Sequence, residues 1–188
     1  ELTNDDRLAF NFLPGPVEFS QHVLDAYTEP SCSHRGPEFA RDFQETCRWL
    51  CQMSNAARVQ LLMGPGTMAN DAIAAQLGLL DQTGLILISG EFGRRLVSHA
   101  NGARLSFETI EIPEGKAFER KDLQQALDRF PDVSWVWGAH CETSTGVLND
   151  ISVYQEVCRD RGVLLCLDCI SSLGTVPVNL EGVYLASG

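Results

Sequence analysis

Positively charged residues are scarce in this sequence. Its 14 lysine and arginine residues face 25 aspartate and glutamate residues, which gives a formal net charge of -11 at pH 7. Only two of the positive residues are lysines, Lys116 and Lys121. A chain this acidic has no electrostatic attraction to a phosphate backbone, so nucleic acid is excluded as an expected partner.

Long apolar runs are also missing. No run approaches the roughly 20 apolar residues that a membrane-spanning helix requires. The first six residues, ELTNDD, are mostly acidic or polar, unlike the start of a secretory signal peptide. We therefore expect a cytoplasmic protein without a membrane partner.

The seven cysteines form no disulfide framework that the sequence reveals. Their number is odd and they are scattered through apolar segments, which is typical of reduced thiols in the cytosol. Cys166 and Cys169 have CxxC spacing, but residues three apart on a strand point to opposite faces of the sheet. A redox or metal role for this pair is the less favoured alternative, and we predict no metal site.

Short apolar runs alternate with helix-like segments after residue 58. The runs cover residues 59–63, 85–88, 105–112, 133–139, 163–167 and 183–186. Strands that are apolar throughout and separated by helices are typical of a parallel sheet covered on both faces. The pattern predicts an α/β fold with three α/β/α layers and a mainly parallel sheet over residues 59–188. An arm and a first helix precede it over residues 1–58.

Clusters of glycine, hydroxyl and acidic residues follow four of these predicted strands. They cover residues 64–67, 89–93, 140–146 and 168–172. The carboxyl ends of parallel strands share one edge of the sheet, where ligands bind in such folds. The four clusters are therefore expected to converge on one site.

Each cluster has a functional and an ordinary interpretation. Residues 64–67, GPGT, open a helix whose N–H groups suit a phosphate, but they also suit an ordinary turn. Asp168 ends an apolar strand, where a desolvated carboxylate needs a cation or hydrogen-bond donors; capping a turn is the alternative. Phe92 suits stacking on a flat ligand or packing in the core. His140 is equally well interpreted as a hydrogen-bonded histidine at a strand end.

Six segments, in order and at family-like spacing, resemble the class V, fold-type I aminotransferases that depend on pyridoxal 5'-phosphate (PLP). The segments are PGP at 14–16, SHRGPEF at 33–39, GPGT at 64–67, GEFGRR at 90–95, HCETSTGVL at 140–148 and DCISSLG at 168–174. The resemblance runs from about Phe12 to Gly188. It is strongest to alanine–glyoxylate, serine–pyruvate and 2-aminoethylphosphonate–pyruvate aminotransferases.

The resemblance implies roles for particular residues. Asp168 would be the catalytic residue of this chain, pairing with the cofactor's ring nitrogen and keeping that nitrogen protonated. The phosphate would be bound by Gly66, Thr67 and Met68. Phe92 and Ile170 would pack on the two faces of the ring, and His140 would approach it. Thr143 would lie near the ring hydroxyl or the phosphate. The substrate entrance would include Pro14, Gly15, His34 and Arg35. The whole protein would be a homodimer that acts on a small amino acid, or an aminophosphonate, and a 2-oxo acid.

The chain departs from the family pattern at its end. The family's Schiff-base lysine follows the sixth strand, after a Ser-Gly like Ser187-Gly188, and neither Lys116 nor Lys121 stands at such a place. We therefore expect an inactive N-terminal fragment of the large domain. The small C-terminal domain would be missing, and so would an antiparallel strand between the first and sixth strands.

Three other functions remain as alternatives. Cysteine desulfurases and kynureninase-like lyases share this scaffold, although residues 140–148 favour a transaminase. A catalytically dead binding or structural module would also lack the lysine. A nucleotide-binding domain is disfavoured, because no GxGxxG follows the first strand.

Overall fold

The computed structural model describes residues 15 and 17–188. The chain divides into two compact units, residues 1–44 and residues 45–188. The first unit contains helix α1 (Gln21–Ala26) and the start of helix α2 (Pro37–Ser54). Within it, Phe39 and Phe43 lie one turn apart on α2 and stack with their ring centroids 6.1 Å apart. The second unit contains the sheet and all the residues discussed below as a site.

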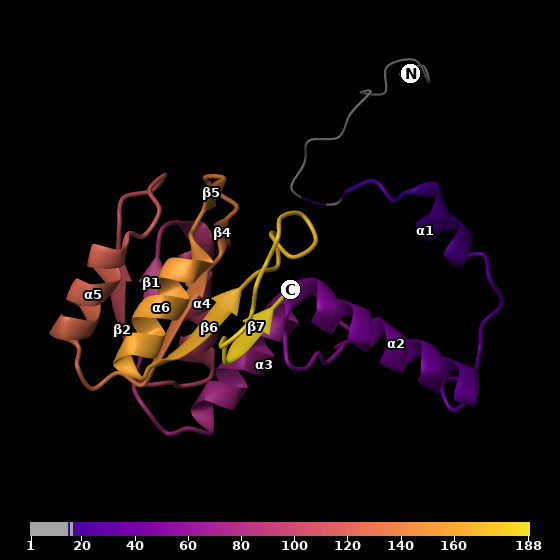
Figure 1. Ribbon diagram of the computed structural model, residues 1–188, viewed down its shortest axis with the longest axis horizontal. Coiled ribbons are helices and arrows are strands. Elements are labelled where there is room, and N and C mark those ends of the chain that lie inside the picture. The colour runs from indigo at the N-terminus through magenta and orange to yellow at the C-terminus, as the bar shows by residue number, and fades with distance from the viewer. Residues whose placement is uncertain (1–14, 16) are drawn as a thin grey trace, which may run out of the picture. The chain divides into compact units, whose positions relative to one another are not determined.

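A five-stranded sheet forms the centre of the second unit. The strands are β1 (Gly84–Ile88), β2 (Phe107–Glu111), β3 (Trp135–Ala139), β6 (Leu164–Asp168) and β7 (Leu185–Ser187). They lie in the order β2-β1-β3-β6-β7, and every neighbouring pair is parallel (Figure 1). The expected α/β architecture with a mainly parallel sheet is confirmed.

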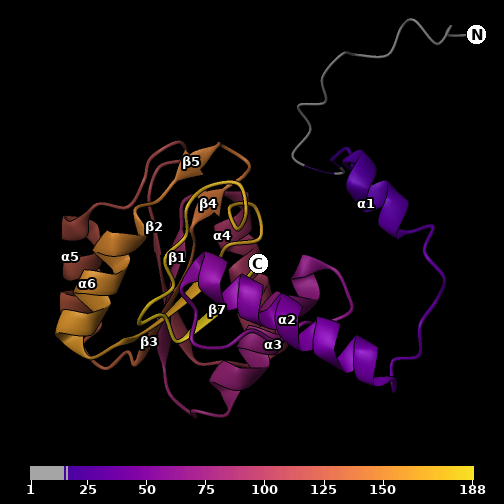
Figure 2. The same cartoon turned by 45° about the vertical axis from the view of Figure 1, so that its right-hand side comes forward.

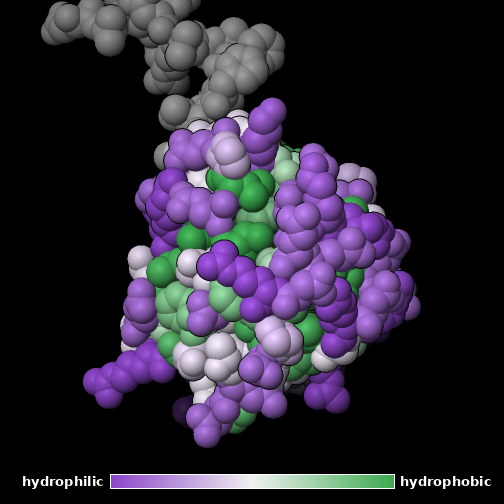
Figure 3. Space-filling view, turned by 90° about the vertical axis from the view of Figure 1, so that its left-hand side faces the viewer, coloured by the Kyte–Doolittle hydropathy of each residue, from purple (hydrophilic) through white to green (hydrophobic). Residues whose placement is uncertain are grey.

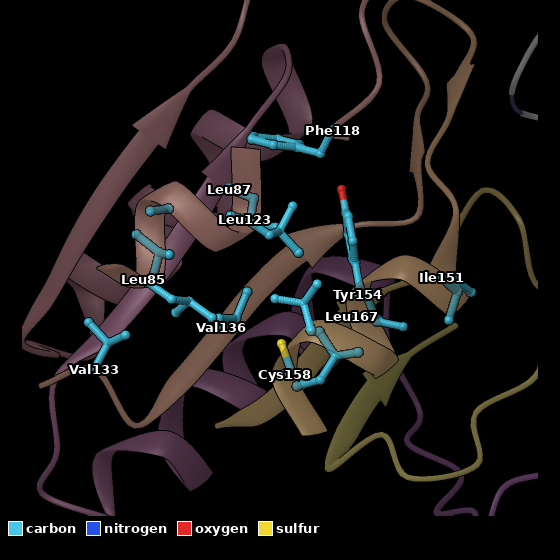
Figure 4. Close-up of a cluster of buried hydrophobic side chains, with 14 of the residues drawn as sticks. Leu85, Leu87, Phe118, Leu123, Val133, Val136, Ile151, Tyr154, Cys158 and Leu167 are labelled. Atoms are coloured by element: carbon cyan, nitrogen blue, oxygen red, sulfur yellow. The ribbon is translucent and has the colours of Figure 1, made fainter. Parts of the chain in front are cut away.

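Helices cover both faces of this sheet, because each central strand is apolar on both sides. Leu85 and Leu87 of β1 pack in one core, which also contains residues of α5 (Arg120–Arg129) and α6 (Ile151–Arg161). The intervening Ile86 and Ile88 pack in a second core with residues of α3 (Gly66–Gly78) and α4 (Glu91–Gly102). Figure 4 shows the first core, where Leu123 of α5 and Tyr154 of α6 lie against the strands. Period-two alternation in a fully buried strand thus produces two separate cores.

A small antiparallel hairpin follows β3 at the carboxyl edge of the sheet. It consists of β4 (Cys141–Glu142) and β5 (Val147–Leu148), which pair Cys141 with Leu148. In Figure 2 the hairpin projects beyond the ends of the central strands. The hairpin therefore lies at the same edge of the sheet as the loops that follow the neighbouring strands.

The outer edge of the sheet on the β2 side carries charge. Glu108 and Glu111 of β2 are exposed, and Glu111 pairs with Arg94 at 2.8 Å. Seen from this side, hydrophilic side chains cover most of the surface, with apolar groups visible between them (Figure 3). Charge on an edge strand discourages pairing with another chain.

The predicted first strand at residues 59–63 was wrong. The segment forms no strand, and Leu61, Leu62 and Met63 are 40%, 51% and 100% exposed. An extended apolar run becomes a strand only when a neighbouring strand bonds its backbone. Within the described residues no strand pairs with this run. The other five predicted strands are present, with ends shifted by at most two residues.

Among the described residues, no helix combines the length and the apolar character needed to cross a bilayer. All seven cysteines are free thiols. Cys166 and Cys169 are both buried, and burial raises the pKa of each thiol to about 12.

Candidate active site

A cavity of about 190 Å³ lies at the carboxyl edge of the sheet. All four clusters that the sequence pointed to contribute residues to it. The lining residues are Pro65, Gly66, Thr67, Asn70, Phe92, Arg95, His99, Cys141, Thr143, Asp168, Ile170 and Ser171. The loops after β1, β3 and β6 therefore converge, as the parallel topology requires, and residues 65–67 join them at the start of α3, where no strand precedes them.

Asp168, the last residue of β6, is held in one orientation. Its side chain is 7% exposed. One carboxylate oxygen, Oδ2, accepts a hydrogen bond from Asn70 Nδ2 at 2.9 Å. The other, Oδ1, accepts one from the backbone N–H of Ile170 at 3.0 Å. A buried carboxylate needs such donors, and two of them leave acceptor capacity on both oxygens for a ligand.

The N-terminus of α3 opens onto the same cavity. Its N-cap residue is Pro65, and no side chain caps this end of the helix. Gly66 approaches Ile170 so closely that a Cβ atom at Gly66 would lie 2.7 Å from Ile170 Cδ1. A helix N-terminus without a side-chain cap presents N–H groups and a positive partial charge to whatever fills the cavity.

Phe92 reaches the cavity from the first turn of α4, and Glu142 of the hairpin fixes that turn. Glu142 is completely buried. Its carboxylate accepts hydrogen bonds from the backbone N–H groups of Phe92 at 3.1 Å and Gly93 at 3.2 Å. It also accepts one from Ser144 Oγ at 2.5 Å and one from Ser144 N at 3.3 Å. A carboxylate at this position satisfies the orphan donors of the helix and favours its dipole.

An arginine side chain lies against the phenylalanine. The Arg95 guanidinium lies over the Phe92 ring, 4.7 Å from its centroid, and Arg95 Nε donates to Glu91 Oε1 at 3.1 Å. One turn later on α4, His99 Nδ1 lies 2.6 Å from Asp71 Oδ1 of α3. The cavity thus combines an arginine and a helix N-terminus with a single lining carboxylate, Asp168.

The hydroxyl and imidazole groups of the predicted site occupy different places. Thr143 lines the cavity, and its hydroxyl is hydrogen-bonded to that of Ser171. His140 is buried at 4% exposure and is not among the lining residues; its Nδ1 lies 2.8 Å from Ser172 Oγ. Burial lowers the pKa of His140, so its imidazole is neutral at neutral pH.

The remaining predicted residues are Met68 and those of the predicted substrate entrance. Met68 is not a lining residue, and its backbone N–H donates to the carbonyl of Pro65 at 2.9 Å. Gly15, His34 and Arg35 belong to the first unit and are exposed there. Pro14 lies outside the described residues.

Sequence reasoning assigned no role to Asn70, His99 or Glu142. The first two carry a helical signal. Asn70 lies one turn after Gly66 on α3, and His99 lies two turns after Phe92 on α4, so each shares a face with a predicted residue. Glu142 carries no such signal, because its partners are 49 and 50 residues away in the sequence.

The sequence profile of the aminotransferase class-V family matches residues 18–185. The chain therefore belongs to the class V aminotransferase family. The 2-aminoethylphosphonate–pyruvate transaminase of Pseudomonas aeruginosa is 34% identical over 189 residues, which cover 97% of this chain and 50% of that enzyme. The corresponding transaminase of Pseudomonas putida is 31% identical, over 93% of this chain and 50% of its own length.

A solved structure of the alanine–glyoxylate aminotransferase from Nostoc sp. has the same fold. It superimposes with a TM-score of 0.85 at 30% identity, over 99% of this chain and 52% of that one. The chain thus spans about half the length of the relatives that it matches.

Proposed function

We propose that the cavity binds pyridoxal 5'-phosphate and that the chain is the cofactor-binding part of an aminotransferase large domain. The observation that carries this proposal is the convergence, in one cavity, of a held carboxylate, an uncapped helix N-terminus and two apolar side chains. These are Asp168, residues Gly66 and Thr67, and the pair Phe92 and Ile170. Family membership supports the same cofactor, because class V aminotransferases depend on PLP.

The residues present fit the cofactor's three chemical parts. The α3 N-terminus suits a phosphate dianion, since its N–H groups and dipole favour negative charge. Phe92 and Ile170 suit the two faces of a flat ring. Asp168 suits a protonated ring nitrogen, because an opposite charge nearby favours the charged form of that nitrogen. When bound, PLP supplies an aldehyde that combines with amines and a ring that withdraws electrons.

The chain's own residues then have separate tasks. Asp168 would hold the proton on the ring nitrogen. Glu142 would keep the first turn of α4 in place, so that Phe92 presents its ring to the cavity. Thr143 and Ser171 would offer hydroxyl groups to polar atoms of the cofactor. Neither lysine of the chain, Lys116 or Lys121, lines the cavity.

The cofactor proposal can be tested with pyridoxamine 5'-phosphate, the amine form, because it cannot react covalently with surface lysines. We expect saturable binding by the 188-residue chain, followed by the ligand's fluorescence. Asp168→Asn should weaken binding about tenfold or more, since a hydrogen bond to a charged group contributes about 1.5–3 kcal/mol. Asp160→Asn, an exposed control, should bind as the unaltered chain does. Absent saturation, or equal affinity in the Asp168 variant, would contradict the proposal.

For the whole protein we propose a cytoplasmic homodimeric transaminase acting on a small amino acid or aminophosphonate and a 2-oxo acid. The relatives named above act on 2-aminoethylphosphonate and pyruvate, or on alanine and glyoxylate, by their names. The test offers each of these amines to the longest natural form of the protein and measures the oxo product. Size-exclusion chromatography with light scattering tests the dimer. No turnover of any amine would leave a non-catalytic binding module as the better account.

A cysteine desulfurase is the second candidate, because Cys141 lines the cavity. Such an enzyme needs a reactive thiolate. Burial and the neighbouring Glu142 raise the pKa of Cys141, which disfavours the thiolate at neutral pH. The observation therefore favours the transaminase, and alanine formed from cysteine would reverse this preference.

A further inference from the structure

Asp168 is not held by side chains of its own strand. Its Oδ2 accepts from Asn70 on α3, 98 residues earlier in the chain, at 2.9 Å. Asn70 Oδ1 in turn accepts from Ser187 Oγ on β7 at 2.7 Å. All three side chains are buried, with exposures of 7%, 4% and 3% for Asp168, Asn70 and Ser187. Three separate elements thus meet in one hydrogen-bond relay.

Chemistry fixes the direction of this relay. An ionised carboxylate only accepts hydrogen bonds, so Asn70 must present its NH2 group to Asp168. The amide oxygen of Asn70 then faces Ser187, whose hydroxyl must donate to it. The Asp168 carboxylate therefore sets which way the Asn70 amide faces, and Ser187 restrains the amide in that orientation by donating to its oxygen.

A neutral amide and a cationic partner differ in how much negative charge they leave on the carboxylate. An arginine or lysine at this position would fix the Asp168 carboxylate and also neutralise its charge. The neutral Asn70 amide fixes the carboxylate and leaves its negative charge available to a ligand. The one other donor to the carboxylate among the described residues, the backbone N–H of Ile170, is also neutral.

We propose that Asn70, locked by Ser187, is a positioning residue that aims the uncompensated Asp168 carboxylate at a cationic ring nitrogen in the cavity. The inference rests on the proposed function, in which Asp168 meets the nitrogen of PLP. Asn70 also lines the cavity, so its amide and the carboxylate are presented to the ligand together.

The test compares two ligands that differ only at the ring nitrogen. These are pyridoxamine 5'-phosphate and its 1-deaza analogue, in which C–H replaces the nitrogen. The unaltered chain should bind the first at least about tenfold more tightly, the effect of one hydrogen bond to a charged group. Asn70→Leu, which keeps the side-chain shape, should weaken pyridoxamine 5'-phosphate about tenfold and leave the deaza analogue unchanged.

Two further variants control for folding. Gln76→Leu changes an exposed amide on the same helix and should alter neither affinity. Ser187→Ala leaves Asn70 in place but releases its amide, so it should show the same ligand pattern with a smaller loss. If Asn70→Leu fails to fold, as judged by circular dichroism, Ser187→Ala carries the test.

The outcomes separate the two ideas. Equal weakening of both ligands in the Asn70 variant, or no weakening of either, would overturn the positioning role and leave the PLP site intact. If the unaltered chain binds neither ligand, the proposed function fails and the inference fails with it. Loss of the preference for the nitrogen-containing ligand, with the deaza affinity retained, is the result that the relay predicts.

Discussion

We expect the stability of the fold to depend more strongly on the buried carboxylate of Glu142 than on any other single charged side chain among the described residues. Glu142→Gln keeps the volume of the side chain but replaces one acceptor oxygen with an NH2 donor. That donor would face backbone N–H groups that now donate to the carboxylate, those of Phe92 and Gly93 or that of Ser144. The site has no room for the side chain to turn away, since a Cβ at Gly90 would lie 2.7 Å from the Glu142 carboxyl carbon.

The magnitude follows from the donors that lose their partner. Each unsatisfied buried donor costs about 1–3 kcal/mol, and about two would be unsatisfied. The lower cost of burying a neutral group offsets part of this loss. We therefore expect the free energy of unfolding to fall by about 3 kcal/mol.

Urea denaturation followed by tryptophan fluorescence measures this change, because Trp135 and Trp137 are completely buried. The matched control is Glu111→Gln. It replaces an exposed carboxylate that pairs with Arg94 of α4, the helix whose first turn Glu142 holds. We expect the control to unfold as the unaltered protein does, since exposed ion pairs contribute little. A Glu142→Gln midpoint and slope equal to those of the control would refute the reasoning.

Two further predictions concern packing and titration. Gly93→Ala should destabilise the fold by about 1–3 kcal/mol or more, because its Cβ would lie 2.8 Å from Ile88 Cα and 3.0 Å from Leu87 O, which are backbone atoms. On the same helix, a Cβ atom at Gly102 would meet nothing within 4 Å, so Gly102→Ala should be neutral or stabilising. Thermal melting compares the two variants, and equal melting temperatures for Gly93→Ala and Gly102→Ala would contradict this prediction. Burial raises the pKa of Cys166 from its usual 9.0 to about 12, so the unfolded chain releases that proton first and stability falls as pH rises from about 9 to about 12. The difference in unfolding free energy between Cys166→Ala and the unaltered protein should therefore shrink by up to about 1.4 kcal/mol per pH unit in that range, and a pH-independent difference would contradict the assignment.

The layers of the fold could be predicted from the sequence because local patterns determine them. Strands such as Leu85 to Ile88 are apolar at every position, which only a sheet covered on both faces satisfies. The run at residues 59–63 is apolar except for Gln60, yet it forms no strand. Composition indicates which side chains a segment would bury. Strand formation also needs a neighbouring strand, and pairing between distant segments is not encoded locally.

Part of the candidate site could also be predicted from local patterns in the sequence. Asp168 stands out because a charge ends an apolar strand, and Phe92 stands out because an aromatic residue lies close to two glycines, Gly90 and Gly93. Asn70 is indicated only by its one-turn spacing from Gly66 on α3, since an asparagine inside a helix has no local reason to be buried. Its role depends on Ser187, which lies 117 residues away in the chain. Contacts across such separations become visible only when the strand order is known.

The strand order β2-β1-β3-β6-β7 also bears on how the molecule forms. No neighbouring pair in the sheet is joined by a tight hairpin, so every pairing closes a long loop before any contact is gained. During synthesis β1, with all five residues buried in the native state, leaves the ribosome well before its neighbour β3 exists. We therefore expect slow folding and a nascent chain that relies on chaperones until residues 135–139 have emerged.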